Sequence, residues 1–294
     1  TGGWDSDFPN SMLEILRGNL LELDDHQRFI VGGVENVLPR LWGQPAPCAP
    51  WPEGTTLAAL NGGATLGRAV RISRDAGGAL TVTDQWGVTR SYAAVLVTCQ
   101  SHLLTTSVSV DEALFDQKLW MALDRTRYMQ AAKTFVMVDR PFWNDPGPDG
   151  RPLLSMTLTD RNTRGTYFFD NGPDKPAVIC LSYSWMTELA LSALERIYPG
   201  VDIRSHIRGN PICVSWEADE NFLGAFKGAL PGHYRYNHRM YGHFMQADLP
   251  AEQRGIFLAG DGISWTPAWV EGAVQTALNA VWGVMTHLGG TSPK

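Results

Sequence analysis

Residues 256–275, IFLAGDGISWTPAWVEGAVQ, decide the fold, because they join a strand-like run to a helix through a glycine turn. The apolar run ends at Gly260-Asp261, an aromatic stretch follows, and an Ala-rich segment then continues with helical character. The N-terminus of a helix carries partial positive charge from its free N–H groups. A strand, a glycine turn and such a terminus together form a pocket for an anion or an electron-rich ring. The alternative from the residues alone is that Asp261 is a turn residue and the tryptophans are core.

Around this junction the chain mixes strand-like and helix-like segments without a regular βαβ alternation, which predicts an α+β fold with a mixed sheet. Helical spacing of apolar residues predicts helices over 11–23, 112–129, 186–200 and 269–290. Alternating or continuous apolar runs bounded by turn residues predict strands over 67–75, 79–87, 91–99, 133–143, 153–160, 165–170, 177–185, 211–217 and 256–260.

The composition excludes several classes of function. The chain has 294 residues, 44% of them hydrophobic, and a net charge of −6, so it has no basic surface for nucleic acid or for an anionic membrane. It has no apolar run long enough to span a membrane. Its four cysteines lie far apart without a C-x-x-C pair, which favours core thiols and a cytoplasmic location. Three neighbouring histidines recur at intervals of five: His233, His238 and His243. This spacing places them on no common face of a helix or a strand, so no metal site is predicted.

Several motifs follow one another along the chain: VGGVENVLPRLW (31–42), AVRISRD (69–75) with AAVLVTC (93–99), KTFVMVDRPFW (133–143), ICLSYSW (179–185), SWEADENFLGAFKGALPGHYRYN (215–237) and the junction itself. Together and in this order, they resemble those of the flavin amine oxidase family. The likeness is closest to its bacterial branch of tryptophan, lysine and phenylalanine 2-monooxygenases and related L-amino-acid oxidases. The resemblance implies two domains. An FAD-binding domain would comprise 29–105 and 251–294, and a substrate domain would comprise 1–28 and 106–250.

The resemblance also implies residues for the cofactor site. Gly260 and Asp261 would lie at the ribityl or pyrophosphate region of FAD. The backbone of Trp269 and Val270 would face the pyrimidine edge of the flavin, with the following helix behind it and its N-terminus stabilising negative charge on the ring. The strand that begins at Ala69-Val70 would pass the adenine.

Lys133 would be the family's lysine that holds a water near flavin N5 and promotes reaction with oxygen. From the residues alone, a surface lysine that opens a strand is the simpler interpretation. An aromatic box would exclude water and hold the substrate α-carbon over the ring, and its members would be Tyr183, Trp185, Phe226 and Trp269. An aromatic core pair is the alternative for Tyr183 and Trp185. Asp5 aligns with the region that meets the substrate side chain, where a carboxylate would suit a basic amino acid; an N-cap or solvent role is the alternative.

A G-x-G-x-x-G motif, which lets a dinucleotide pyrophosphate approach the backbone, is not present in the 294 residues. In the family this motif lies near the N-terminus, and an arginine that binds the substrate carboxylate follows it. We therefore expect a second polypeptide to supply the Rossmann βαβ unit and the arginine. The expected enzyme is a heteromer, with a dimer of heterodimers as one arrangement.

The implied reaction starts with hydride transfer from the α-carbon of an L-amino acid to the flavin, and O2 then reoxidises the flavin. Because the neutral amine is required, the rate should rise with pH. Release of the imino acid would give a 2-oxo acid, ammonia and H2O2, whereas oxidative decarboxylation in the site would give an amide. Two other classes remain: an oxidase of amines that are not amino acids, and a non-catalytic subunit that has kept the fold.

Overall fold

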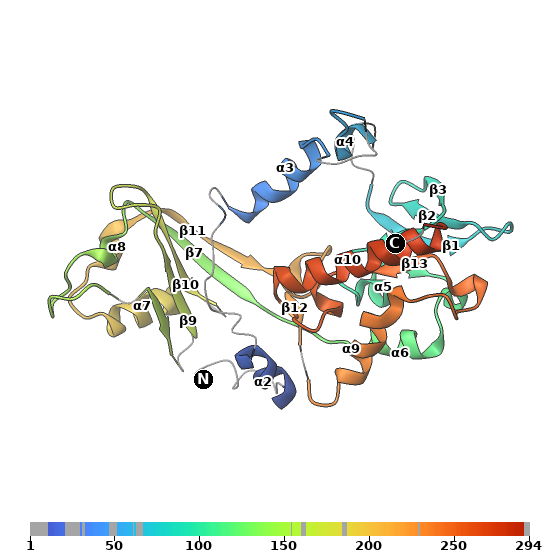
Figure 1. The fold of residues 1–294 in the computed structure, drawn as a ribbon. Helices are drawn as coiled ribbons and strands as arrows, with labels where there is room; N and C mark the ends of the chain where they lie inside the picture. The colour runs from blue at the N-terminus through green and yellow to red at the C-terminus, as the bar shows by residue number, and fades with distance from the viewer. Residues whose placement is uncertain are drawn as a thin grey trace.

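The computed structural model describes residues 11–20, 30, 33–46, 52–60, 62, 67–153, 155–159, 163–183, 187–228 and 230–290. Buried apolar side chains form two large cores within these residues. The first core collects side chains from strands before residue 100, from the strand at 256–258 and from three helices. The second lies under a five-stranded sheet, which Figure 1 shows on the left, with the C-terminal helix and the other strands on the right.

The first sheet is antiparallel except at one edge, with the order β3-β2-β1-β5. Its strands are β1 (Ala69–Arg74), β2 (Leu80–Asp84), β3 (Thr89–Tyr92) and β5 (Ser109–Val110). The expectation of a single strand over 91–99 is wrong, because the chain leaves this sheet at Ala93-Ala94. The following residues form β4 (Val95–Val97), which pairs in parallel with β13 (Ile256–Leu258). The turn at 93–94 thus divides one apolar run between two sheets.

The second sheet has the order β11-β7-β10-β9-β8, and every pairing in it is antiparallel. Its strands are β7 (Ala132–Val138), β8 (Met156–Leu158), β9 (Gly165–Phe169), β10 (Ala177–Ser182) and β11 (Ile207–Ser215). Along β7 the even-numbered side chains are buried, whereas Lys133, Phe135 and Met137 are half-buried or exposed. Because side chains alternate between the two faces of a strand, Lys133 lies on the face of the sheet that points away from the second core.

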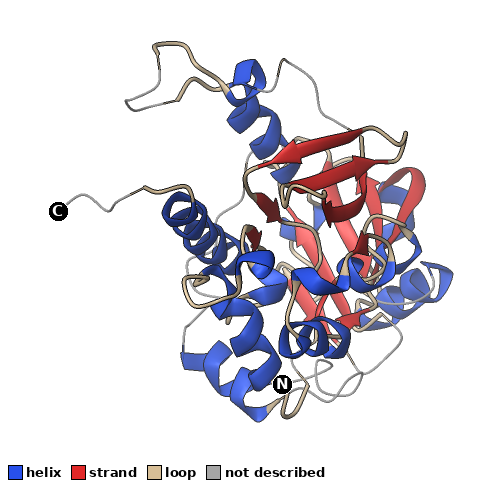
Figure 2. Cartoon of the chain, turned by 90° about the vertical axis from the view of Figure 1, so that its right-hand side faces the viewer, coloured by secondary structure: helices blue, strands red, loops and turns tan. Residues whose placement is uncertain are grey.

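The long helices are α2 (Met12–Leu20), α6 (Gln117–Arg125), α7 (Thr187–Ile197), α9 (Tyr234–Tyr241) and α10 (Val270–His287). Figure 2 shows helices along one side of the strands and below them. The shorter elements are α3 (Val37–Gly43), α4 (Leu57–Leu60), α5 (Leu103–Thr106), α8 (Ile203–His206), β6 (Tyr128–Met129), β12 (Phe226–Lys227), and the 3-10 turns η1 (Val34–Asn36), η2 (Glu112–Leu114), η3 (Phe142–Asn144), η4 (Trp216–Ala218), η5 (Gly242–Phe244), η6 (Ala251–Gln253) and η7 (Asp261–Ile263).

Helices α6 and α9 pack together and contribute Leu119, Leu123 and Met240 to the core that β1 and β13 also line. Asp116 caps α6 by accepting a hydrogen bond from Leu119 N at 2.7 Å, and Arg239 of α9 pairs with the same carboxylate group. The division of the chain into FAD-binding and substrate domains stays a prediction. Among the described residues, no helix is both long enough and apolar enough to cross a bilayer.

His243, just after α9, should make the stability of the fold depend on pH. Burial lowers the pKa of His243 to about 4, and the charge of Arg239 acts in the same direction. Because the folded pKa lies below the unfolded one, the contribution of His243 is complete above about pH 6.5 and is lost as the pH falls toward 4. We expect the free energy of unfolding to fall by about 2 kcal/mol between pH 7.5 and 5 through this residue.

Urea unfolding of the wild-type chain and of His243→Gln at the two pH values measures this effect. The variant should lose that part of the pH dependence, whereas His238→Gln, at an exposed position of α9, should keep it. An unchanged pH dependence in His243→Gln would mean that the imidazole stays neutral in both states or charged in both.

Candidate active site

The turn after β13 is held by α10. Gly260 has φ 131° and ψ 160°, a conformation that is almost restricted to glycine. Thr276 of α10 contacts both backbone groups of this glycine: Gly260 N donates to Thr276 Oγ1 at 2.9 Å, and the hydroxyl lies 3.0 Å from Gly260 O. The end of the strand and the middle of the helix are therefore fixed against each other at one residue.

Asp261 organises the loop that leads into α10. Its Oδ2 accepts a hydrogen bond from Ala268 N at 2.9 Å, and Ala268 has a φ of 67°, which is uncommon for a residue with a side chain. Ser264 N and Ser264 Oγ donate to the carbonyl oxygen of Asp261 at 3.0 and 2.7 Å. The carboxylate thus stabilises a strained loop within this chain, whatever else it binds.

Helix α10 begins at Val270, one residue after the predicted start, with Trp269 as the N-cap residue. The side chain of Trp269 does not cap the helix. The first N–H groups of this 18-residue helix therefore face the loop without a capping side chain from the N-cap residue. The loop crosses the helix closely at Gly272, where a Cβ atom would overlap Ser264 Oγ and the Thr266 carbonyl oxygen. Thr266 Oγ1 is buried there, and no hydrogen-bond partner for it lies among the described residues.

Lys133 and Tyr183 lie together at one end of the second sheet. The ammonium nitrogen of Lys133 is 4.5 Å from the centroid of the Tyr183 ring, within the range of a cation–π contact. Tyr183 follows β10, and its backbone N–H donates to Gly165 O at 3.2 Å and to Thr163 O at 3.3 Å. Burial raises the pKa of the Tyr183 hydroxyl, so this ring stays neutral beside the cation.

The other predicted site residues are spread over several elements. Phe226 begins β12, which pairs with β6, and its side chain is half-buried. Ala69 and Val70 begin β1 in the antiparallel sheet rather than in the parallel β4–β13 pair. Asp5 and Trp185 lie outside the described residues. The structure therefore brings together Lys133 with Tyr183, and Gly260 and Asp261 with the start of α10. The roles of these residues stay predictions.

A buried polar cluster beneath the loop was not predicted from the sequence. Lys227, 7% exposed, donates from Nζ to Asn237 Oδ1 and, at 3.2 Å, to Ser264 O. Asn237 Nδ2 donates to the same carbonyl at 2.9 Å. The only signal in the sequence is a lysine inside the otherwise apolar stretch GAFKGAL (224–230).

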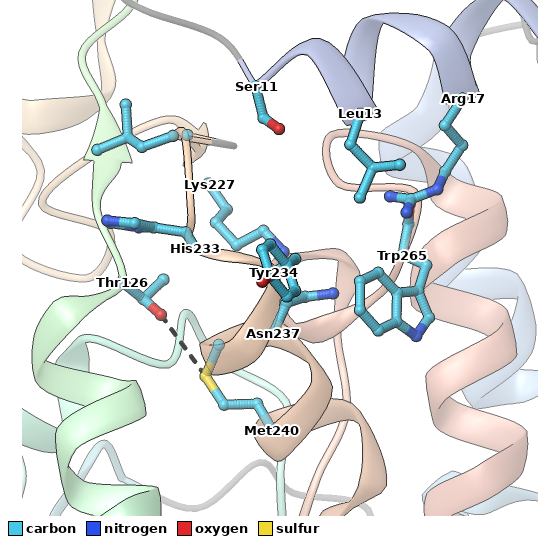
Figure 3. A pocket seen from close by; sticks show the side chains of 12 residues that line it. Ser11, Leu13, Arg17, Thr126, Lys227, His233, Tyr234, Asn237, Met240 and Trp265 are labelled. Atoms are coloured by element: carbon cyan, nitrogen blue, oxygen red, sulfur yellow. Dashed lines mark hydrogen bonds between the residues drawn. The ribbon is translucent and has the colours of Figure 1, made fainter.

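A pocket opens beside this cluster, between α2 and α9 (Figure 3). Arg17 of α2 donates from Nη1 to Trp265 O at 2.9 Å, and its guanidinium carbon lies 5.0 Å from the centre of the Trp265 ring. Lys227, Asn237 and Met240 line the pocket from below. The loop between β13 and α10 is thus held from both sides, by α10 and by residues of α2, α9 and β12.

The packing of Tyr128 against Gly262 is a second contact that was not predicted from the sequence. Its hydroxyl accepts a hydrogen bond from Ser101 N at 3.1 Å, and a Cβ atom at Gly262 would overlap that hydroxyl oxygen. Burial raises the pKa of Tyr128 to about 12, and the negative charge of Asp261 acts in the same direction. Tyr128 therefore packs as a neutral ring against the glycine that follows Asp261.

Comparison with known proteins places this chain in a family. The family model described as flavin containing amine oxidoreductase matches residues 3–285. The tryptophan 2-monooxygenase of Pantoea agglomerans pv. gypsophilae is 29% identical over 99% of this chain and 54% of its own length. That of Pseudomonas savastanoi is 28% identical over 100% of this chain and 55% of its own length. The chain thus spans about half the length of these relatives. A putative L-amino-acid oxidase of Bacillus subtilis (strain 168) is 25% identical over 55% of the chain and 34% of its own length.

Solved structures support the fold. A putrescine oxidase double mutant superposes with a TM-score of 0.53 over 79% of this chain and 50% of that one, at 14% sequence identity. The wild-type putrescine oxidase bound to putrescine gives 0.51 over 75% and 47%. At this identity the likeness concerns the fold alone. The match of the family model to nearly the whole chain, on a fold shared with an amine oxidase, shows that the chain belongs to the flavin containing amine oxidoreductase family.

Proposed function

We propose that this chain forms one half of the FAD site, and most of the substrate site, of an enzyme that oxidises an L-amino acid. The observation that carries the proposal is the junction of β13 and α10, where Asp261, a loop with two unusual φ angles and an uncapped helix terminus meet. The choice of substrate class is supported by the relatives that cover nearly the whole chain, which are named tryptophan 2-monooxygenase.

The residues at the junction fit a flavin dinucleotide. Gly272 gives the loop its close approach to the helix, and the uncapped N–H groups at the start of α10 favour a group that carries negative charge. When bound, the flavin would accept a hydride from the substrate α-carbon and pass the electrons to O2.

Within this arrangement each residue of the chain has a defined task. Asp261 holds Ala268 through Oδ2, which leaves Oδ1 to accept a hydrogen bond from a ribityl hydroxyl. Trp269 and Phe226 exclude water from the substrate side of the site. Lys133 donates from Nζ to a water and supplies positive charge where oxygen is reduced, and Tyr183 keeps that cation in place by its ring.

The rest of the site would come from a second polypeptide that carries the G-x-G-x-x-G motif and the arginine for the substrate carboxylate. The products would be a 2-oxo acid, ammonia and H2O2 where water and O2 are consumed. They would be an amide, CO2 and water where the substrate is decarboxylated within the site.

Anaerobic mixing of the purified, flavin-loaded assembly with a panel of L-amino acids tests this function. Visible absorbance should show bleaching of the oxidised flavin bands with at least one L-amino acid, and simple amines such as putrescine serve as the comparison. Bleaching with amines alone would favour an amine oxidase. A flavin that no compound bleaches would favour a non-catalytic subunit.

A further inference from the structure

Strand β12 is two residues long, and its two side chains lie on opposite faces. Phe226 and Lys227 are consecutive, and successive side chains of a strand point to opposite sides. Phe226 is half-buried, whereas Lys227 is 7% exposed. The strand therefore presents an aromatic ring to one side and a buried ammonium group to the other.

The backbone of β12 is held at both of its ends. Gln100, which follows β4, donates from Nε2 to Gly224 O at 3.0 Å and to Ala225 O at 3.3 Å. Ala225 N and Gly228 N donate to carbonyl groups of the segment 127–129, both at 2.8 Å. The position of the aromatic ring on β12 is therefore set by contacts with the end of β4 and with β6.

Lys227 ties the same strand to the loop between β13 and α10. Its Nζ donates to Asn237 Oδ1 and, at 3.2 Å, to Ser264 O, which also accepts from Asn237 Nδ2 at 2.9 Å. Ser264 in turn fixes the loop, because its N and Oγ donate to Asp261 O and its Oγ accepts from Thr266 N at 3.1 Å. Hydrogen bonds from a charged donor are stronger than neutral ones, so a shift of β12 is passed on to this loop.

We propose that Lys227 is a positioning residue that couples the substrate side of the site to its cofactor side. Through Lys227, Phe226 and the loop that carries Trp269 move as one unit. This inference rests on the proposed function, in which Phe226 faces the substrate and the loop faces the flavin. A substrate that displaces the ring of Phe226 thus also changes the position of the loop, so substrate fit and cofactor environment are set together.

A second link between the same elements runs through Tyr128. Its strand β6 pairs with β12, and its hydroxyl oxygen packs against Gly262. The two links reach different parts of the loop, since Tyr128 contacts it at Gly262 and Lys227 contacts it at Ser264. Amide hydrogen exchange can therefore tell them apart by position.

A double-mutant cycle in the assembled, flavin-loaded protein tests the coupling. Gln100→Leu removes the two hydrogen bonds to the backbone before β12 and is made in the wild-type chain and in Lys227→Met. We expect Gln100→Leu to raise amide exchange over 264–268 about tenfold in the wild-type chain and to leave it unchanged in Lys227→Met. Lys118→Met, at an exposed position of α6, is the control background, in which Gln100→Leu should act as in the wild-type chain. Three amides of this segment are hydrogen-bonded within the loop: those of Ser264, Thr266 and Ala268.

The other outcomes of the cycle contradict the proposal. An equal rise in both backgrounds, or a rise confined to 261–263, would assign the link to Tyr128. No rise in either background would mean that the two sides of the site are independent. A rise over 264–268 that is matched by the amides of β10 would be a loss of global stability. Where Lys227→Met does not fold, Lys227→Gln keeps a neutral donor and should weaken the coupling rather than abolish it.

Stopped-flow reduction of the flavin gives an independent readout. Lys227→Met should raise the Kd of the amino acid about tenfold relative to Lys118→Met, because the ring of Phe226 loses its tie to the loop. A lysine that only stabilised the fold would lower the amount of loaded protein and leave the Kd of the loaded fraction unchanged, which would overturn the proposal. If no amino acid bleaches the flavin of the wild-type assembly, the proposed function fails, and the exchange cycle alone decides whether Lys227 couples the two sides.

Discussion

Replacing Lys133 by methionine should slow the reaction of the reduced flavin with oxygen by about 100-fold, the typical cost of removing one preorganised charged group from a reaction centre. Reduction by the amino acid should change much less. Methionine keeps the length and most of the apolar surface of lysine, so the variant removes the charge and the donor with little effect on packing. Lys133 is half-buried beside Tyr183, where a cation is less screened than at the surface.

Stopped-flow measurements separate the two half-reactions in the assembled protein. Lys175→Met is the matched control, because Lys175 lies exposed on the loop between β9 and β10 of the same sheet. Equal slowing of both half-reactions in Lys133→Met would reject a role in oxygen activation and favour a role in positioning the flavin or the substrate. Equal rates of both half-reactions in the two methionine variants would mean that Lys133 is an ordinary strand residue without a role in the reaction.

The parts of the fold that the sequence predicts are those with strong local signals. β13, α10 and the central part of β7 lie within a few residues of the predicted bounds, since continuous apolar runs and helical spacing are local properties. The glycine turn between β13 and α10 was also predicted from its residues, and Gly260 has a φ of 131° there.

Helix α9 was not predicted, and its sequence explains why. YRYNHRMY is short and mostly polar, and its buried residues are Asn237 and Met240. The segment is stabilised as a helix by its packing against α6, including the pair of Arg239 with Asp116. The same reason applies to the division of 91–99 between β3 and β4. β3 pairs with its neighbour β2, whereas β4 pairs with β13, which is far away in the sequence.

The candidate site divides in the same way. Asp261 and Lys133 could be named from motifs, whereas the contacts that hold them could not. Gly272 and Thr276 read as ordinary residues of an Ala-rich helix, and their importance is visible only when the loop at 264–266 crosses that helix. Tyr128 lies more than 130 residues from Gly262, so no local pattern indicates that the two are in contact.

Replacing Gly272 by alanine should destabilise the protein and weaken FAD binding, although alanine is the better residue for a helix interior by about 1 kcal/mol. A Cβ atom there would overlap Ser264 Oγ and the Thr266 carbonyl and lie 2.6 Å from Thr266 Oγ1. The carbonyl belongs to backbone and cannot turn away, so the loop and the helix terminus must separate. Overpacking of this kind costs about 1–3 kcal/mol, which outweighs the helix gain and leaves a net loss of about 1–2 kcal/mol, so the expected fall in Tm is about 5 °C.

Gly43→Ala is the matched control, because a Cβ atom at this last residue of α3 has no atom within 4 Å. Glycine-to-alanine substitution should therefore destabilise the protein at position 272, whereas Gly43→Ala should be neutral or slightly stabilising. Calorimetry and the flavin content of the purified assembly measure both effects. If Gly272→Ala raised Tm and kept its flavin, the loop would have room to move, and the close packing of 264–266 on α10 would not be what shapes the site. If Gly272→Ala lost flavin, the close packing of the loop at 264–266 on α10 would set the position of the helix terminus relative to the cofactor. This packing would then matter more than any side chain at the junction.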